Sequence, residues 1–149
     1  MLHVHVRLRK ALAFLLIPLM FLGSCRTIAY HDVNSFVKTA ELKAKALTLM
    51  DHATEEYATY TNQVDEVLIL GEQLYAIQKA RDLNHASIGQ WKILMERNIA
   101  TQKSILPSFF KEWKTKGKLS QTFVDEARPQ VEAAFDEILK LEDSKLKKP

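Results

Sequence analysis

Residues 35–81 read SFVKTAELKAKALTLMDHATEEYATYTNQVDEVLILGEQLYAIQKAR, the longest run of helical pattern in the chain. Apolar side chains recur there every three or four residues, the spacing of one buried helix face. From residue 50 this face comprises Met50, Ala53, Tyr57, Tyr60, Val64, Val67, Gly71 and Leu74. The pattern favours one long helix over residues 35–81, about 70 Å in length. The alternative is a break at residues 59–62. We expect Gly71, on this face, to allow close helix packing and not to act as a hinge. In an unbroken helix the far half would overhang its partners as a docking surface.

The rest of the chain predicts three further helices, over residues 87–105, 108–116 and 121–142. Ser87 and Ser120 can cap two of them, because a serine hydroxyl accepts a hydrogen bond from a free backbone N–H group. Gly117 suits a helix end, and Pro129 is expected to kink or restart the last helix. The residues after 142 are polar and are expected to fray.

The composition is that of a helical globular domain. Of the 149 residues, 47% are apolar and 26% charged, and there are only four Gly and four Pro. This is too apolar for a disordered chain and too poor in turn-forming residues for an all-β fold. The predicted fold class is all-α, an antiparallel bundle of three main helices plus one short helix, with residues 35–149 as one domain.

The first 24 residues have the pattern of a secretory signal. Arg7, Arg9 and Lys10 precede an apolar run, ALAFLLIPLMFL, over residues 11–22. That run spans about 18 Å as a helix, well short of the hydrocarbon core of a bilayer. A cleaved signal peptide over residues 1–24 is therefore favoured over an uncleaved membrane anchor.

The single cysteine of the chain comes directly after this signal, in the sequence Leu22-Gly23-Ser24-Cys25. This tetrapeptide resembles the lipobox of bacterial lipoproteins. The resemblance covers residues 1–25 only, and it implies lipid transfer to the Cys25 thiol, cleavage between Ser24 and Cys25, and acylation of the new amino group. The alternative is an ordinary secretory cut that leaves a free thiol.

The resemblance also bears on where the protein resides. An Asp directly after the lipidated Cys tends to retain Gram-negative lipoproteins in the inner membrane, and this chain has Arg26 there. The outer membrane, facing the periplasm, is therefore favoured if the host has one. Residues 25–34 are predicted to be the lipidated Cys25 and a short tether without a periodic pattern, and the nine residues after Cys25 reach at most about 30 Å.

Charge argues against a nucleic-acid partner. Three of the 21 basic residues lie before Cys25, and the remaining 18 equal the 18 acidic residues. The mature chain therefore has no net charge, whereas proteins that bind nucleic acids carry an excess of Lys and Arg.

No pattern for catalysis, a metal or a cofactor stands out. His31, His52 and His85 are scattered, and His52 pairs only with Glu55 at a spacing of three, typical of an ion pair on a solvated helix face. Di-iron carboxylate bundles need two Glu-x-x-His pairs. An enzyme is therefore not predicted.

One stretch, FFKEWKTKGK at residues 109–118, mixes aromatic and basic residues. Its candidate surface or ligand patch comprises Phe109, Phe110, Lys111, Trp113, Lys114 and Lys118. It could lie on an anionic surface, but aromatic rings that cap the core beneath solvated lysines are the favoured interpretation. Likewise, Tyr57, Tyr60, Tyr75 and Trp91 could line a ligand pocket, but they are favoured as core residues.

The sequence thus predicts a lipoprotein of the bacterial envelope with a small, non-catalytic helical domain for interaction or structure. Its partners would be the membrane, through the lipid on Cys25, and an envelope protein of unknown identity. The alternatives are a helical binding domain for a small ligand or an anionic polymer or lipid surface, and an inhibitor or immunity-type lipoprotein.

Overall fold

The computed structural model describes residues 29–96 and 104–146, and within these ranges the chain is all-helical. The helices are α2 (Val33–Asp51), α3 (Tyr57–Lys79), α4 (His85–Met95), α5 (Ile105–Lys116) and α6 (Gln121–Ser144). The predicted all-α class is confirmed. The signal, the lipobox and Cys25 lie outside the described residues, as do residues 97–103 of the second predicted helix.

The prediction of one helix over residues 35–81 is wrong, because the chain turns between α2 and α3 at residues 52–56. This break also lies upstream of the predicted weak point at residues 59–62. The turn contains neither Gly nor Pro, and a distant loop satisfies its backbone. The Ala53 carbonyl accepts from the N–H group of Leu119 at 2.8 Å, and the N–H group of Tyr57 donates to the Gly117 carbonyl at 2.8 Å. Since α3 packs along α2 after the turn, no half of a long helix overhangs.

The apolar period continues through the turn, which explains why the sequence pattern did not reveal it. Met50 and Ala53 are fully buried and Tyr57 is nearly so, although only the first lies in α2 and the last in α3. Two antiparallel helices joined by a turn can bury the same residues as one continuous helix, so the apolar period alone does not distinguish them.

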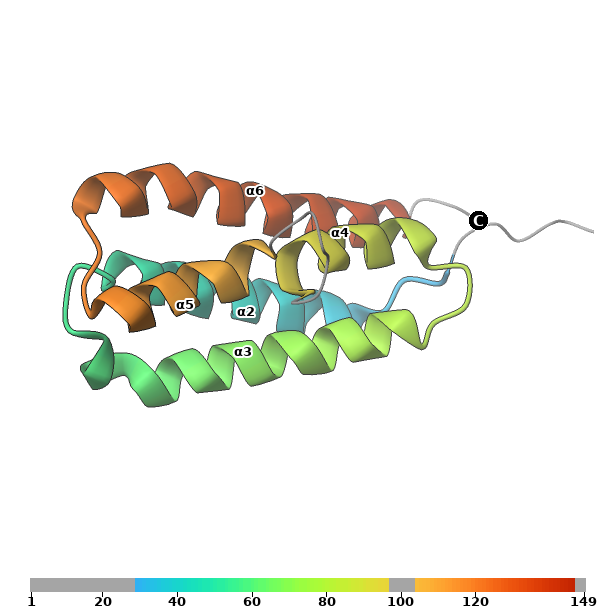
Figure 1. The fold of residues 1–149 in the computed structure, drawn as a ribbon. Helices are drawn as coiled ribbons and strands as arrows, with labels where there is room; N and C mark the ends of the chain where they lie inside the picture. Colours follow the sequence, from blue (N-terminus) through green and yellow to red (C-terminus); the bar gives the residue numbers. More distant parts are fainter. Residues whose placement is uncertain (1–28, 97–103, 147–149) are drawn as a thin grey trace, which may run out of the picture.

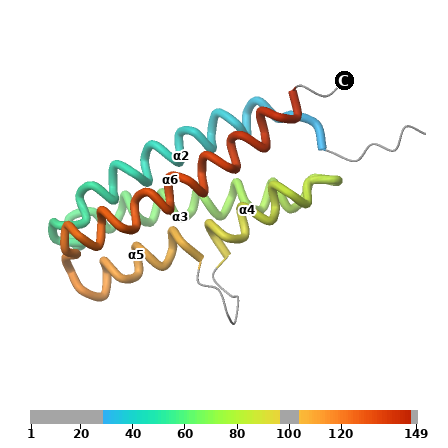
Figure 2. The backbone as a smooth tube through the Cα atoms, turned by 90° about the horizontal axis from the view of Figure 1, so that it is seen from above, coloured from blue at the N-terminus to red at the C-terminus, as the bar shows by residue number. Residues whose placement is uncertain are grey.

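The helices lie lengthwise beside one another (Figure 1). Helix α2 packs against α3 and α6, and α4 packs against α3 and α6. Helices α4 and α5 follow each other roughly end to end beside α3, as both views show (Figures 1 and 2). The start of α2, the α3–α4 turn and the end of α6 lie at one end of the molecule, and the α2–α3 and α5–α6 turns at the other.

The core contains large side chains from every helix. Those that are buried below 2% exposure include Leu42, Met50, Leu74, Trp91, Leu106, Phe110, Trp113, Phe135 and Ile138. Gly71 allows the close packing that its position predicts, because a Cβ atom there would lie 2.6 Å from the Met95 Cε atom of α4. A glycine on this seam therefore lets α4 approach α3.

Several helix ends match the prediction and others differ. Gly117 ends α5 with a φ of 76°, and the Ser120 hydroxyl caps α6 by accepting from the N–H group of Phe123 at 3.3 Å. Helix α4 begins at His85, so Ser87 lies inside it and is not its cap. Helix α6 continues through Pro129 to Ser144, so it does not restart there.

No helix within the described ranges has the length and apolar character needed to cross a membrane.

Candidate functional site

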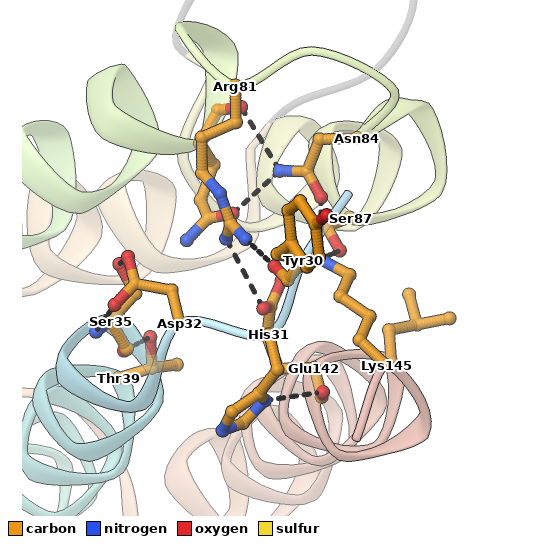
Figure 3. Close-up of polar contacts among 12 residues, drawn as sticks. Tyr30, His31, Asp32, Ser35, Thr39, Arg81, Asn84, Ser87, Glu142 and Lys145 are labelled. Carbon is orange, nitrogen blue, oxygen red and sulfur yellow. Dashed lines mark hydrogen bonds and ion pairs between the residues drawn. The ribbon is translucent and has the colours of Figure 1, made fainter. Parts of the chain in front are cut away.

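Residues 29–32 are fastened to the domain, although the sequence predicted a free tether as far as residue 34. The N–H group of Ala29 donates to the Leu83 carbonyl at 3.1 Å, and the Arg81 guanidinium donates to the Tyr30 carbonyl. His31 Nδ1 lies 2.8 Å from the Glu142 carbonyl. Because a carbonyl can only accept, this ring nitrogen carries the proton. The chain segment nearest to Cys25 is thus held to α6 and to the α3–α4 turn (Figure 3).

Asp32 completes this attachment by capping α2. One carboxylate oxygen accepts from the N–H groups of Asn34 and Ser35, both at 3.1 Å, and the other accepts from the Ser35 hydroxyl at 2.7 Å. These hydrogen bonds, led by the one from the Ser35 hydroxyl, lower the pKa of Asp32. Helix α2 therefore begins at Val33, two residues before the predicted start.

Directly beside this attachment lies a buried ion cluster formed by Arg81, Glu142 and Lys145. The Glu142 side chain is 1% exposed, Lys145 is 5% exposed and Arg81 is 17% exposed. Arg81 Nη1 lies 3.3 Å from Glu142 Oε2, while Lys145 pairs with Oε1. The Ser87 hydroxyl donates to the same Oε1 at 3.0 Å. One carboxylate thus joins α4, α6 and the chain just after α3.

The neighbouring amides extend this cluster. Asn84 Oδ1 accepts from the Lys145 ammonium at 2.6 Å, and Asn84 Nδ2 donates to Gln78 Oε1 at 2.6 Å. Gln78 Oε1 also accepts from Arg81 at 3.0 Å. Within the described part of the chain, Gln78 Nε2 is buried without a hydrogen-bond partner.

Burial lowers the pKa of Lys145, and the hydrogen bond and charge of Glu142 oppose that shift. The charged groups of the cluster are engaged with one another, which suits a rigid fastening. In residues 29–96 and 104–146, no group of three or more His, Cys, Asp or Glu side chains could hold a metal ion.

This cluster was not predicted, although the sequence contained a signal for it. Glu142 follows Ile138 by four residues on the buried stripe of α6, where an apolar side chain is expected. A charged residue on a core stripe predicts a buried partner. The prediction of a frayed tail after residue 142 is wrong for Lys145, whose side chain is buried.

The structure does not assemble the candidate patch at residues 109–118 on the surface. Phe109, Phe110 and Trp113 are buried at 3%, 1% and 0% exposure. The Trp113 indole N–H donates to the Glu55 carbonyl at 3.0 Å, which helps to hold the α2–α3 turn. The rings therefore cannot lie on a membrane or a polymer without unfolding α5.

Only the lysines of the patch face solvent. Lys118 pairs with Glu56 at 3.2 Å, and Lys111 and Lys114 are exposed. An open groove beside α5 has Lys111 and Lys114 in its lining, but also Asp65, Glu112 and Glu126. This mixed charge does not favour an anionic ligand.

The four aromatic residues considered for a ligand pocket do not converge. Tyr57 contacts Trp113 edge to face, and Tyr60 stacks on His52. Tyr75 lies 18 residues after Tyr57 on α3, about 27 Å from it. Its hydroxyl donates to Glu96 Oε2 at 3.2 Å. Trp91 is fully buried in α4.

His52 Nδ1 lies 2.9 Å from Glu55 Oε1, the predicted local contact, but both residues lie in the α2–α3 turn and not on a helix face. Glu55 also accepts from the Tyr60 hydroxyl at 2.7 Å, and these two hydrogen bonds lower its pKa. His31 and His85 lie on segments at the opposite end of the molecule (Figures 1 and 2).

Comparisons of the chain with protein-family models, with curated proteins and with solved structures find no match.

Proposed function

We propose that this protein is an exported bacterial lipoprotein, cut between Ser24 and Cys25 and attached to a membrane through lipid on Cys25. The observation that carries the proposal is the sequence Leu22-Gly23-Ser24-Cys25 at the end of an apolar run, with the only cysteine of the chain in the position to be lipidated. With Arg26 next, the outer membrane facing the periplasm is the proposed location if the host has one.

The attachment of residues 29–32 supports this proposal. Only residues 26–28 separate Cys25 from Ala29, so the two Cα atoms lie within about 14 Å of each other. A lipid on Cys25 would therefore hold the domain close to the bilayer. The ion cluster next to Ala29 would resist any force that pulls on the anchor.

We further propose that the helices form an antiparallel bundle that acts by binding, not by catalysis. The packing of α2 on α3 and α6 supports the bundle. The pairing of Arg81 and Lys145 with the buried Glu142 supports a structural role for this polar cluster. The proposed partner is another envelope protein. The balanced charge of the mature chain disfavours nucleic acid.

The test compares the full chain with Cys25→Ser in a bacterial host, by cell fractionation and intact mass. The proposal expects a membrane-bound product whose mass equals residues 25–149 plus lipid, and loss of that lipid in Cys25→Ser. Ser24→Ala is the matched control, because a small residue before the cysteine should preserve lipidation. A wild-type product without lipid would overturn the proposal.

A further inference from the structure

We infer that the end of the domain next to the anchor rests on the bilayer itself, with four exposed apolar side chains in the headgroup layer. They form what we call the apolar end face: Tyr30, Val33, Leu83 and Leu146, which are 67%, 64%, 41% and 59% exposed. This inference rests on the proposed lipid on Cys25 and adds the surface by which the domain meets the membrane.

The four residues belong to segments that lie at one end of the molecule. The Leu83 carbonyl accepts from Ala29, directly before Tyr30 in the chain. Val33 is the first residue of α2, and Leu146 follows the last turn of α6. The start of α2, the α3–α4 turn and the end of α6 lie together in both views (Figures 1 and 2).

The backbone of Leu83 provides a second, independent observation. Its φ is 59°, and among the described residues it is the only one other than glycine with a positive φ. The left-handed conformation is unfavourable for a residue that carries a side chain, and glycine or asparagine usually occupies it. At this strained position the large apolar side chain of Leu83 is exposed to solvent. Contact of such a side chain with water is unfavourable, whereas its contact with a membrane interface is favourable.

The length of chain before Ala29 identifies the bilayer as the occupant of this face. With about 14 Å at most between the Cα atoms of Cys25 and Ala29, a membrane that holds the lipid lies within reach of Tyr30 and Leu83. Asp82, directly before Leu83, and His85, two residues after it, are exposed. Insertion must therefore stop in the polar headgroup layer, and it does not require anionic lipid.

The experiment measures how deeply single residues of the full lipidated chain lie in the bilayer. Because lipid would block the thiol of Cys25, an added cysteine can be labelled alone with a polarity-sensitive nitrobenzoxadiazole dye. Leu83→Cys and Leu146→Cys probe the apolar end face, and Glu56→Cys probes the opposite end, where the carboxylate forms an exposed pair with Lys118. Each labelled protein is reconstituted into vesicles of phosphatidylcholine and phosphatidylethanolamine with or without spin-labelled lipid.

Dyes at positions 83 and 146 should emit at shorter wavelength, and spin-labelled lipid should quench them at least about threefold more than at position 56, as expected for interfacial burial. A second variant separates membrane contact from folding. Adding Leu83→Gly to Leu146→Cys should reduce quenching at least about twofold while the melting temperature stays equal or rises, because glycine relieves the strained φ.

Failure of this inference differs from failure of the proposed function. A wild-type chain without lipid, whose Cys25 reacts with the dye, would remove the anchor and the inference with it. A lipidated chain whose dyes at 83 and 146 are quenched no more than at 56 would overturn the inference alone. Self-quenching between labelled copies without quenching by lipid would assign the face to a second copy of the chain, and would also overturn it.

Discussion

The ammonium group of Lys145 pairs with the carboxylate of Glu142 one turn earlier in α6, with only 5% and 1% of the two side chains exposed. Glu142 also pairs with Arg81, and the carbonyl of the same residue bonds to His31. One residue of the last helix therefore fixes both the α3–α4 turn and the segment that leads to Cys25.

Removal of either partner should destabilise the protein strongly. Lys145→Met or Glu142→Gln should each lower the free energy of unfolding by about 3 kcal/mol, because a buried charge then loses one of its partners. The double variant should lower the free energy of unfolding by less than the sum of the two single effects, with a coupling free energy of about 1–3 kcal/mol. Urea unfolding followed by circular dichroism measures all three.

Lys140→Met is the matched control for this cycle. Lys140 lies on the same helix, is 78% exposed and pairs with Glu137 at 3.6 Å, so its replacement should change stability by less than about 0.5 kcal/mol. Strictly additive effects of Lys145→Met and Glu142→Gln would show that the two groups do not interact.

The cap of α2 should make part of the stability dependent on pH. Since the pKa of Asp32 is lowered from 3.8 in the folded state, its contribution is complete above that value and is lost as the pH falls through the folded-state pKa. Asp32→Ala should therefore cost about 1 kcal/mol at pH 7 and less at pH 3. Urea unfolding at both pH values tests this difference.

Asp32→Asn provides the comparison, because an amide oxygen can still cap the helix but does not titrate. Its stability relative to wild type should improve as the pH falls. An equal cost of Asp32→Ala at both pH values would show that the charged form of Asp32 is not favoured by folding.

The two tryptophans form a natural pair for testing the α2–α3 turn. Both are fully buried, but Trp113 donates to the Glu55 carbonyl, whereas the indole N–H of Trp91 has no partner in the part of the chain that the structure describes. Trp113→Phe should therefore lower the free energy of unfolding by about 1–2 kcal/mol more than Trp91→Phe. Thermal and urea unfolding of the two variants measure the difference, and an equal cost would contradict the role of the Glu55 contact.

Adjacent residues of α5 should respond in opposite ways. Phe110→Ala should lower the free energy of unfolding by about 3–5 kcal/mol, because the ring is 1% exposed. Lys111→Gln should change it by less than about 0.5 kcal/mol, because that side chain is solvated. Urea unfolding compares the two, and a mild effect of Phe110→Ala would mean that the ring contributes little to the core.

Local signals in the sequence predicted several features correctly. Helical periodicity and the scarcity of Gly and Pro predicted the all-α class, and Gly117 and Ser120 marked a helix end and a helix start. The packing role of Gly71 followed from its place on the apolar stripe. These features depend on residues within a few positions of one another, which is why a single sequence reveals them.

The candidate site was less predictable, because its residues come from distant parts of the chain. His31 lies 111 positions from Glu142, and Ser87 lies 55 positions from it. Among these residues only Glu142 carried a sequence signal, a charge on an apolar stripe. The aromatic stretch at residues 109–118 was predicted correctly in its favoured interpretation, since its rings are buried beneath solvated lysines.

The sequence by itself determined that this chain is helical, where α5 ends and α6 begins, and which residue would take a lipid if the chain is a lipoprotein. Only the tertiary structure decided that residues 35–81 fold back on themselves at residues 52–56 and that residues 29–32 are held against α6. The physical reason is the same in both cases. Backbone groups without a local partner must find one elsewhere, and the groups that satisfy Ala53, Tyr57 and Ala29 become neighbours only after the helices have packed.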